Sequence, residues 1–303
     1  MLRSSKMTIR GHNLSWGKRT YLMGILNITP DSFSGDGLLG NQMEAEKSQL
    51  VKTALNMAQE FMAVGVDIID IGGESTRPGS APITLDEEKS RVIPIIQALS
   101  RDLDVLISVD TYKAEVAQIA LESGADIVND VWGLHADPAL AEVVARFKVP
   151  IILMHNRSSW VHAEVKERLG GHYIDMPYED LIEDIKRELM ESVVTARAAG
   201  ILDEHIILDP GVGFGKTVEQ NLELVNKLDE IRKLGFPVLL GVSRKSFIGY
   251  TLDLPPEQRL EGTAAAITVG IVRGADIIRV HDVSAMARVA RMTDAIVRQQ
   301  LAK

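Results

Sequence analysis

The sequence contains no cysteine among its 303 residues. This absence excludes thiol nucleophiles, disulfides and cysteine-based zinc or iron–sulfur sites. The sequence also lacks an excess of basic residues, because its formal net charge is −9. Nonspecific nucleic-acid binding needs a basic face that neutralises phosphates, so that function class is disfavoured. A small anionic ligand stays possible, because a few arginines and lysines can converge in one cleft.

Long apolar runs are missing as well. None approaches the roughly 18 residues of a membrane span, and Met1–Arg10 has no apolar signal-peptide core. We therefore expect a cytoplasmic protein. Aromatic residues make up only 5% of the chain, although 46% of it is hydrophobic. The apolar content is thus mostly Ala, Val, Ile and Leu, which fill parallel strands and the helices that cover them.

Short apolar runs alternate eight times with longer segments of helical periodicity. The short runs are apolar on both faces, as strands covered by helices should be. The expected strands are Tyr21–Ile28, Val66–Asp70, Val105–Val109, Asp126–Asn129, Pro150–Leu153, His205–Leu208, Val238–Leu240 and Asp276–Val280. The expected helices are Met43–Val64, Leu85–Ser100, Ala114–Ser123, Pro138–Phe147, Tyr178–Ala199, Val218–Leu234, Pro256–Arg273 and Ser284–Gln300.

Eight strand-then-helix units are the count of a closed barrel, which typically needs about 250 residues. The sequence therefore predicts the α/β class with a single (β/α)8 TIM barrel. A doubly wound open sheet is the alternative, but it would show fewer strands or a composition break between two halves. The predicted division is residues 1–19 as an N-terminal extension covering the barrel and residues 20–303 as the barrel.

Polar residues follow nearly every expected strand. In barrels of this type the active site forms at the C-terminal ends of the strands. The strand-end residues with the chemistry of a site are Asn27, Arg77, Asp110, Asn129, His155, Asp209, Lys245, Arg279 and His281. One such residue alone is more often a helix cap or a turn former. Eight strand ends in register indicate a functional site.

Arg279 and His281 lie two residues apart on the last strand, so their side chains point to the same side. The last strand is also near the usual phosphate site of barrels. A guanidinium with an imidazole donor makes an oxyanion clamp. The alternative is a surface ion pair between Arg279 and Asp282.

Asp110, Asn129 and Asp209 offer two carboxylates and an amide at the centre of the barrel mouth. This combination suits the donor-rich edge of a heterocycle such as a pterin. An acidic metal site is the alternative, and it is less favoured because Asn129 is a weak ligand.

Gly215-Lys216-Thr217 resembles the end of a phosphate-binding P-loop, but that motif needs glycine where Pro210 stands. The resemblance to a P-loop is therefore discarded. We expect Gly211, Gly213 and Gly215 to let the backbone approach a flat ligand, with Phe214 packing nearby.

Several segments together resemble the dihydropteroate synthases, a family of pterin-binding TIM barrels. The likeness runs in order from about Tyr21 to the end of the chain, and the first two segments are the most specific. The matching segments are Met23–Ser34, Gly72–Gly79, Ser108–Tyr112, Asn129–Asp130, Met154–His155, Asp209–Lys216, Ser243–Ser246 and Arg279–Val283.

The resemblance implies a role for each matching residue, Mg2+ as the cofactor and a homodimer. The pterin would be held by Asp110, Asn129, Asp209, Phe214 and Lys245. The diphosphate would be held by Asn27, Arg77, Arg279 and His281, with Asn27 as the ligand of Mg2+. The 4-aminobenzoate would be framed by Phe33, Thr76, Pro78 and Ser246. The residues expected to act in catalysis are Asn27, Asp36, Thr76, Arg77, Lys245, Arg279 and His281.

Two features depart from the family pattern. An acidic residue usually follows the position of Ser34, whereas here Gly35 comes first and Asp36 second. The segment from Arg157 to Met176 is longer than expected, and the sequence predicts no function for it.

Three other functions are weighed against the synthase. A pterin-dependent methyltransferase would share the acidic strand ends but would not need the Arg279 and His281 clamp. A class I aldolase would use Lys245 as a Schiff-base nucleophile, which leaves the first two loops unexplained. A non-catalytic pterin-binding paralogue is favoured only by the shifted Asp36.

Overall fold

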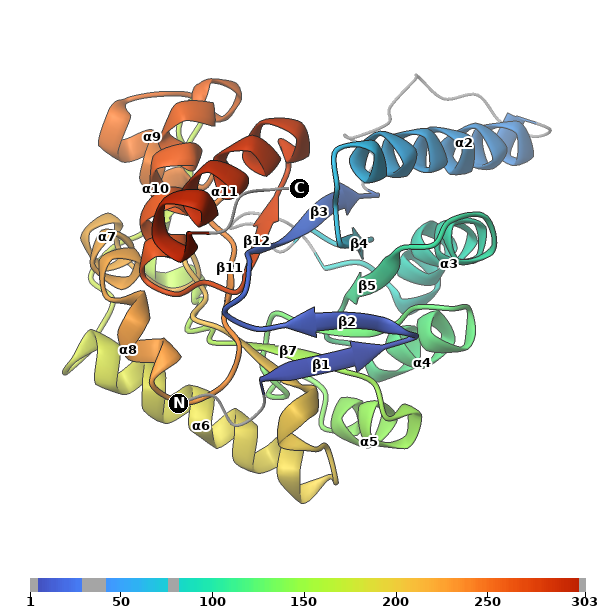
Figure 1. Ribbon diagram of the computed structural model, residues 1–303, viewed down its shortest axis with the longest axis horizontal. Helices are drawn as coiled ribbons and strands as arrows, with labels where there is room; N and C mark the ends of the chain where they lie inside the picture. Colours follow the sequence, from blue (N-terminus) through green and yellow to red (C-terminus); the bar gives the residue numbers. More distant parts are fainter. Residues whose placement is uncertain (1–4, 29–41, 76–81, 300–303) are drawn as a thin grey trace.

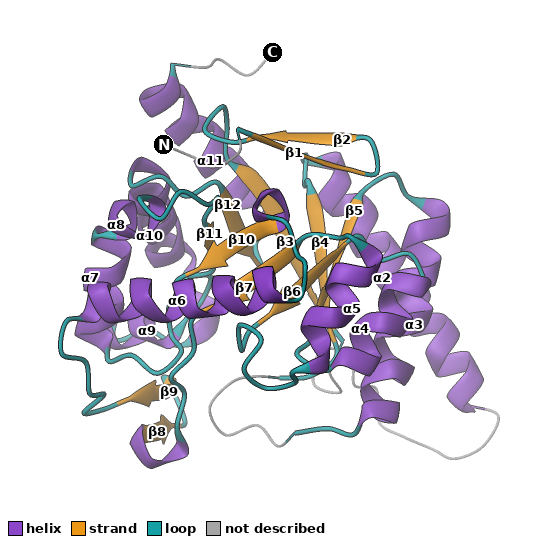
Figure 2. Ribbon diagram, turned by 90° about the horizontal axis from the view of Figure 1, so that it is seen from below, coloured by secondary structure: helices purple, strands orange, loops and turns teal. Residues whose placement is uncertain are grey.

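A closed eight-stranded parallel barrel forms the centre of the molecule (Figures 1 and 2). The computed structural model describes residues 5–28, 42–75 and 82–299. The barrel strands are β3 (Tyr21–Asn27), β4 (Ile68–Gly72), β5 (Leu106–Asp110), β6 (Ile127–Asp130), β7 (Ile151–Met154), β10 (Ile206–Asp209), β11 (Leu239–Leu240) and β12 (Ile277–Val280). Their order in the sheet is β10-β7-β6-β5-β4-β3-β12-β11. A parallel bridge between Leu208 and Val238 joins the first and last of these strands.

Helices lie around the outside of this barrel (Figure 1). They are α2 (Gln42–Ala63), α3 (Leu85–Asp102), α4 (Ala114–Glu122), α5 (Ala139–Phe147), α6 (Leu181–Ala198), α7 (Val218–Asn226), α8 (Leu228–Arg232), α9 (Ser246–Leu252), α10 (Leu260–Val272) and α11 (Val283–Arg298). The prediction of a (β/α)8 TIM barrel is confirmed. None of the helices in the described ranges has both the length and the apolar character needed to cross a membrane.

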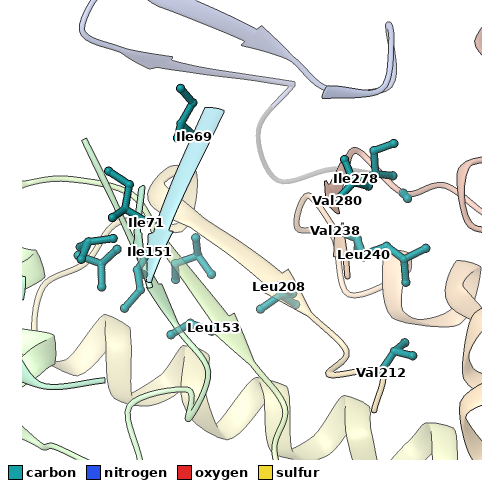
Figure 3. Close-up of a cluster of buried hydrophobic side chains, with 14 of the residues drawn as sticks. Ile69, Ile71, Ile151, Leu153, Leu208, Val212, Val238, Leu240, Ile278 and Val280 are labelled. Carbon is teal, nitrogen blue, oxygen red and sulfur yellow. The ribbon is translucent and has the colours of Figure 1, made fainter. Parts of the chain in front are cut away.

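Two hydrophobic cores result from the alternation of side chains along each strand. Outward residues such as Ile69, Leu208 and Ile278 share one core with residues of the surrounding helices. Figure 3 shows part of this cluster. Inward residues such as Ile68 and Ile277 fill the N-terminal half of the barrel interior. The polar inward residues therefore lie above an apolar floor, toward the C-terminal mouth.

An antiparallel hairpin of β1 (Lys6–Ile9) and β2 (His12–Ser15) precedes the barrel. The buried apolar residues from this segment, including Met7, Leu14 and Trp16, belong to the same core as the inward residues of the strand starts. The Trp16 and Tyr21 rings meet edge to face at 5.5 Å. The hairpin thus covers one end of the barrel (Figure 2). The division of the chain at residues 19 and 20 stays a prediction.

We expect Trp16→Ala to lower the free energy of unfolding by about 3–5 kcal/mol, because it removes a large buried ring from this core. Urea denaturation measures the loss as a lower midpoint. Both substrate KM values should stay unchanged, because Trp16 lies at the end of the barrel away from the strand ends. A large change in either KM would contradict this separation.

Some element boundaries differ from the predicted ones. The expected helix Val218–Leu234 is divided into α7 and α8 at Lys227, whose backbone leaves the helical conformation. The expected helix starting at Pro256 begins at Leu260, after a 3-10 turn at Pro256–Gln258. An additional hairpin of β8 (Ala163–Lys166) and β9 (Gly170–Tyr173) lies within the long segment after β7.

Candidate active site

Arg279 on β12 binds carboxylates of two other strands inside the barrel. Its Nε donates to Asp70 Oδ2 and its Nη2 donates to Asp110 Oδ2, both at 2.6 Å. The Asn129 amide donates to the same Asp70 oxygen at 3.2 Å. The four side chains come from β12, β4, β5 and β6. They form one hydrogen-bonded network across the barrel interior.

Burial and charge oppose each other in this network. Burial raises the pKa of Asp110, and the Arg279 guanidinium opposes that rise. Burial also disfavours the charge of Arg279, but Asp70 and Asp110 outweigh it and raise the Arg279 pKa. Arg279 is therefore a permanent cation at the centre of the site. Its guanidinium has five N–H donors, of which the network uses two, so donors remain for a ligand.

Asp70 is the functional residue that sequence reasoning missed. It is fully buried on β4, and its second oxygen, Oδ1, has no hydrogen-bond partner in the described part of the chain. A signal was present, because an ionisable residue inside an apolar strand is rarely buried unless it is paired.

Asp209, Lys245 and Arg279 converge on Gly241. A Cβ placed on Gly241 would lie 3.8 Å from Lys245 Nζ and 4.0 Å from Asp209 Oδ2. Lys245 Nζ also donates to the Val212 carbonyl and lies 4.6 Å from the centre of the Phe214 ring. An acid and an amine thus come together beside the backbone of Gly241, where any side chain would contact both of them.

The glycines after β10 have another role than the predicted one. A Cβ on Gly211 would lie 1.8 Å from the His155 carbonyl oxygen, and a Cβ on Gly215 would lie 2.3 Å from the Arg157 carbonyl carbon. Both glycines have positive φ. The expectation that these glycines admit a flat ligand is therefore wrong for Gly211 and Gly215, which admit the chain after β7.

The turn before α9 is held in a strained conformation. Arg244 has φ +56°, which is unusual for a residue with a Cβ. Its N–H donates to Thr263 Oγ1 at 3.0 Å, and its guanidinium pairs with Asp282. The alternative interpretation, an ion pair of Arg279 with Asp282, is therefore wrong. This turn presents Lys245 and Ser246 to the barrel mouth.

His281 is close to the same turn. Its Nδ1 and its backbone N each lie 3.1 Å from Ser243 Oγ. Strand β12 ends at Val280, so the expectation that Arg279 and His281 point to the same side stays a prediction. However, the Arg279 guanidinium already binds the carboxylates of Asp70 and Asp110. Arg279 and His281 therefore do not form an oxyanion site whose donors are all unused.

Asn27 and Asp110 converge above Gly72. Asn27 Oδ1 and Asp110 Oδ2 would each lie 3.7 Å from a Cβ on Gly72. No cluster of three or more His, Cys, Asp or Glu in the described ranges could hold a metal ion. Mg2+ keeps several waters and relies on substrate phosphates, so an amide and one carboxylate oxygen are a donor set that it accepts.

The long segment after β7 packs on α9. The rings of His172 and Tyr250 are 4.1 Å apart. Arg259, which is 2% exposed, donates to the Leu169 carbonyl and to the Arg244 carbonyl, each at 2.9 Å. The β8–β9 hairpin is thereby joined to the turn that carries Lys245.

Five of the predicted site residues lie outside the described residues. They are Phe33, Asp36, Thr76, Arg77 and Pro78. Glu74 lies just before the undescribed residues 76–81. Its carboxylate pairs with Lys113 at 2.6 Å, and Lys113 also pairs with Glu88 at 2.7 Å. The described site therefore consists of the strand ends, the glycine-containing turn and the turn before α9.

Comparisons with known proteins agree with this geometry. The profile of the pterin binding enzyme family matches residues 23–281. A dihydropteroate synthase of Clostridium beijerinckii is 48% identical over 97% of this chain and 100% of its own length. The Bacillus subtilis dihydropteroate synthase is 50% identical over 93% of this chain and 90% of its own.

Solved structures are similar over nearly the whole chain. A dihydropteroate synthase from Clostridium difficile, solved in the presence of pteroic acid, has a TM-score of 0.82 and 46% identity, covering 93% of this chain and 98% of its own. The Yersinia pestis enzyme in a sulfonamide complex has a TM-score of 0.83 and 37% identity, covering 97% of this chain and 100% of its own.

Proposed function

Since the chain belongs to the dihydropteroate synthases of the pterin binding enzyme family, we propose how its side chains carry out the reaction of that family. The enzyme joins 6-hydroxymethyl-7,8-dihydropterin diphosphate to 4-aminobenzoate, releasing pyrophosphate, in folate biosynthesis. The observation that carries the assignment of the site is the convergence of Asp209 and Lys245 at Gly241.

In our proposal the pterin ring binds beside Gly241, between Asp209 and Lys245. Its amino group and ring N–H donors need acceptors, which Asp110, Asp209 and the Asn129 amide oxygen supply. Its carbonyl oxygen needs a donor, which Lys245 supplies. Phe214 covers the ring from the side of the glycine-containing turn.

The diphosphate lies nearer the mouth, within reach of Asn27, His281 and the unused N–H groups of Arg279. Arg77 belongs to the same group in our proposal. Thr76, Phe33, Pro78 and Ser246 frame the 4-aminobenzoate, and Asp36 stabilises positive charge on the pterin methylene.

The bond to the diphosphate breaks first, and the arylamine nitrogen then attacks the pterin methylene cation. No covalent nucleophile is needed for this order of events. Protein donors aimed at the leaving oxygens can each contribute about 3–4 kcal/mol to lowering the barrier. Arg279 and His281 supply such donors, and the closed apolar floor below them keeps water from the cation.

Mg2+ would be held through Asn27 and would neutralise charge on the diphosphate when bound. The nearby Asp110 oxygen adds negative charge on the same side of Gly72. This placement is a proposal from the donor set.

Pyrophosphate release tests the reaction. Purified protein receives the dihydropterin diphosphate and Mg2+, with and without 4-aminobenzoate. Arylamine-dependent release together with dihydropteroate supports the proposal. Tight pterin binding without product would indicate a binding paralogue and would contradict it.

Pterin binding is expected to weaken as the pH rises through about 8. Burial lowers the pKa of Lys245 to about 8, although Asp209 opposes this shift. The lysine is therefore charged below this pH and neutral above it, where it is a weaker donor. Calorimetric titration of the pterin between pH 6 and 10 measures the change. Lys245→Arg should remove the alkaline loss, and an unchanged loss in this variant would assign it to another group.

We also propose a homodimer that forms through α10 and α11. These helices pack on each other and expose apolar side chains, with Val272 56% and Ile296 67% exposed. Exposed apolar side chains on two adjoining helices are the kind of surface that an interface covers. Sedimentation of the wild-type protein and of a Val272→Glu variant tests it. The cytoplasmic location stays a prediction.

A further inference from the structure

Lys216 is an almost fully enclosed lysine that the proposed reaction does not use. It is 1% exposed and follows the glycine-containing turn after β10. Its Nζ lies 2.9 Å from three atoms, namely the Gly211 oxygen, the Phe214 oxygen and His155 Nδ1. Burial lowers the pKa of Lys216 well below its usual range. The three partners at 2.9 Å nevertheless match the three N–H donors of an ammonium, so the geometry assigns the charged form.

His155 links Lys216 to a carboxylate. Because carbonyls only accept, the third N–H of Lys216 is directed to His155 Nδ1. His155 Nε2–H then donates to Glu188 Oε2 at 3.0 Å. Burial lowers the pKa of His155 to about 4, which keeps the imidazole neutral. The order is therefore carboxylate, neutral imidazole and ammonium.

Glu188 is fixed from a second side by Arg157, whose Nε lies 3.0 Å from Glu188 Oε2. The same segment, residues 155–157, carries the backbone against which Gly211 and Gly215 pack. Glu188 and His155 thus lie directly behind the turn at 210–216. Lys216, the last residue of this turn, is bonded to His155.

The front of this turn faces the site. Val212 accepts a hydrogen bond from Lys245, and Phe214 lies beside the same amine. The turn begins at Asp209, whose Oδ1 accepts the Gly211 N–H at 2.7 Å. A shift of the turn would therefore move both ionisable groups beside Gly241.

We propose that Glu188, His155 and Lys216 are positioning residues that hold the 210–216 turn, and through it Asp209 and Lys245, in the geometry that binds the pterin. The inference rests on the proposed pterin site. It also gives a role to the lysine of the discarded P-loop motif, which acts on the protein backbone instead of on a phosphate.

The first test is Lys216→Met, which keeps the length of the side chain and removes its donors. The KM for the pterin substrate and the Kd for 6-hydroxymethyl-dihydropterin should both rise about 10- to 100-fold, because small misplacements of binding groups have effects of this size. The KM for 4-aminobenzoate should change less than about twofold, within the uncertainty of independent sites. Arg232→Met is the matched control, since Arg232 is a largely buried cation that donates to a backbone carbonyl at 2.9 Å, away from the turn. It should lower Tm without this change.

His155→Ala provides a second test should Lys216→Met fail to fold. His155 and Glu188 line a cavity of about 250 Å³, so imidazole added to the solution can enter the space that the alanine leaves. Imidazole should restore pterin affinity to His155→Ala but not to Lys216→Met. Equal changes in both KM values, or a loss of Tm alone with no effect of imidazole, would overturn the proposal. Absence of pterin binding by the wild-type protein would instead overturn the proposed site.

Discussion

Arg279→Met is expected to lower kcat/KM by about 1,000-fold or more, because removing one donor to the charge of a leaving group costs about 100- to 1,000-fold. The change also leaves the Asp70 and Asp110 carboxylates without their cation. Pterin binding should therefore weaken together with the condensation rate. Steady-state kinetics and calorimetric binding of the diphosphate-free pterin measure the two losses.

Arg232→Met is again the matched control. Arg232 pairs with Asp276 at 3.0 Å, and the exposed fractions of this pair, 20% and 1%, nearly equal the 20% and 0% of Arg279 and Asp70. Breaking either buried pair should lower stability by about 3–5 kcal/mol. Only the Arg279 variant should lose activity beyond its loss of folded protein. An equal loss in both would make Arg279 a stabilising residue alone.

Asp209→Asn is expected to weaken pterin binding by about 100-fold. The substitution keeps the shape of the side chain but places an amide group where the ligand and Lys245 need an acceptor. A hydrogen bond to a charged group contributes about 1.5–3 kcal/mol, and each 1.4 kcal/mol is about tenfold in affinity. Calorimetry with 6-hydroxymethyl-dihydropterin measures the loss.

Asp126→Asn is the control for this variant. Asp126 is 8% exposed and accepts a backbone N–H from Ile107 at 2.9 Å, much as Asp209 accepts from Gly211. It lies just before the start of β6, at the opposite end of the barrel. Normal affinity in Asp126→Asn with weak binding in Asp209→Asn supports the pterin assignment, and normal affinity in both contradicts it.

The barrel could be predicted from the sequence because the pattern of a short apolar run followed by a helical segment occurs eight times. Each strand is a short apolar run and each helix has its own periodicity, so errors at single boundaries do not change the count. The polar strand ends were predictable for the same reason, since the C-terminal ends of parallel strands converge. Asp110, Asn129, Asp209 and Arg279 indeed meet in the structure within or beside one network.

Pairings between distant strands were not predictable. Arg279 binds Asp70 across 209 positions of sequence, and no local pattern specifies that contact. The expected strand Val66–Asp70 ended two residues early, which placed Asp70 at a strand end instead of within the interior. The glycines after β10 were expected to pack against a ligand. Their sequence does not reveal that the chain after β7 lies against them instead.

The closure of the barrel has a mechanical consequence. Between β10 and β11 the sheet is joined by the single bridge at Leu208 and Val238, so this seam has fewer hydrogen bonds to break than the other strand pairs. Segments of low local stability open first in native proteins. Asp209 and Lys245 stand on opposite sides of the seam, so a pterin bound to both would stabilise the pairing of β10 with β11. Amide hydrogen exchange at Leu208 would therefore slow in the complex.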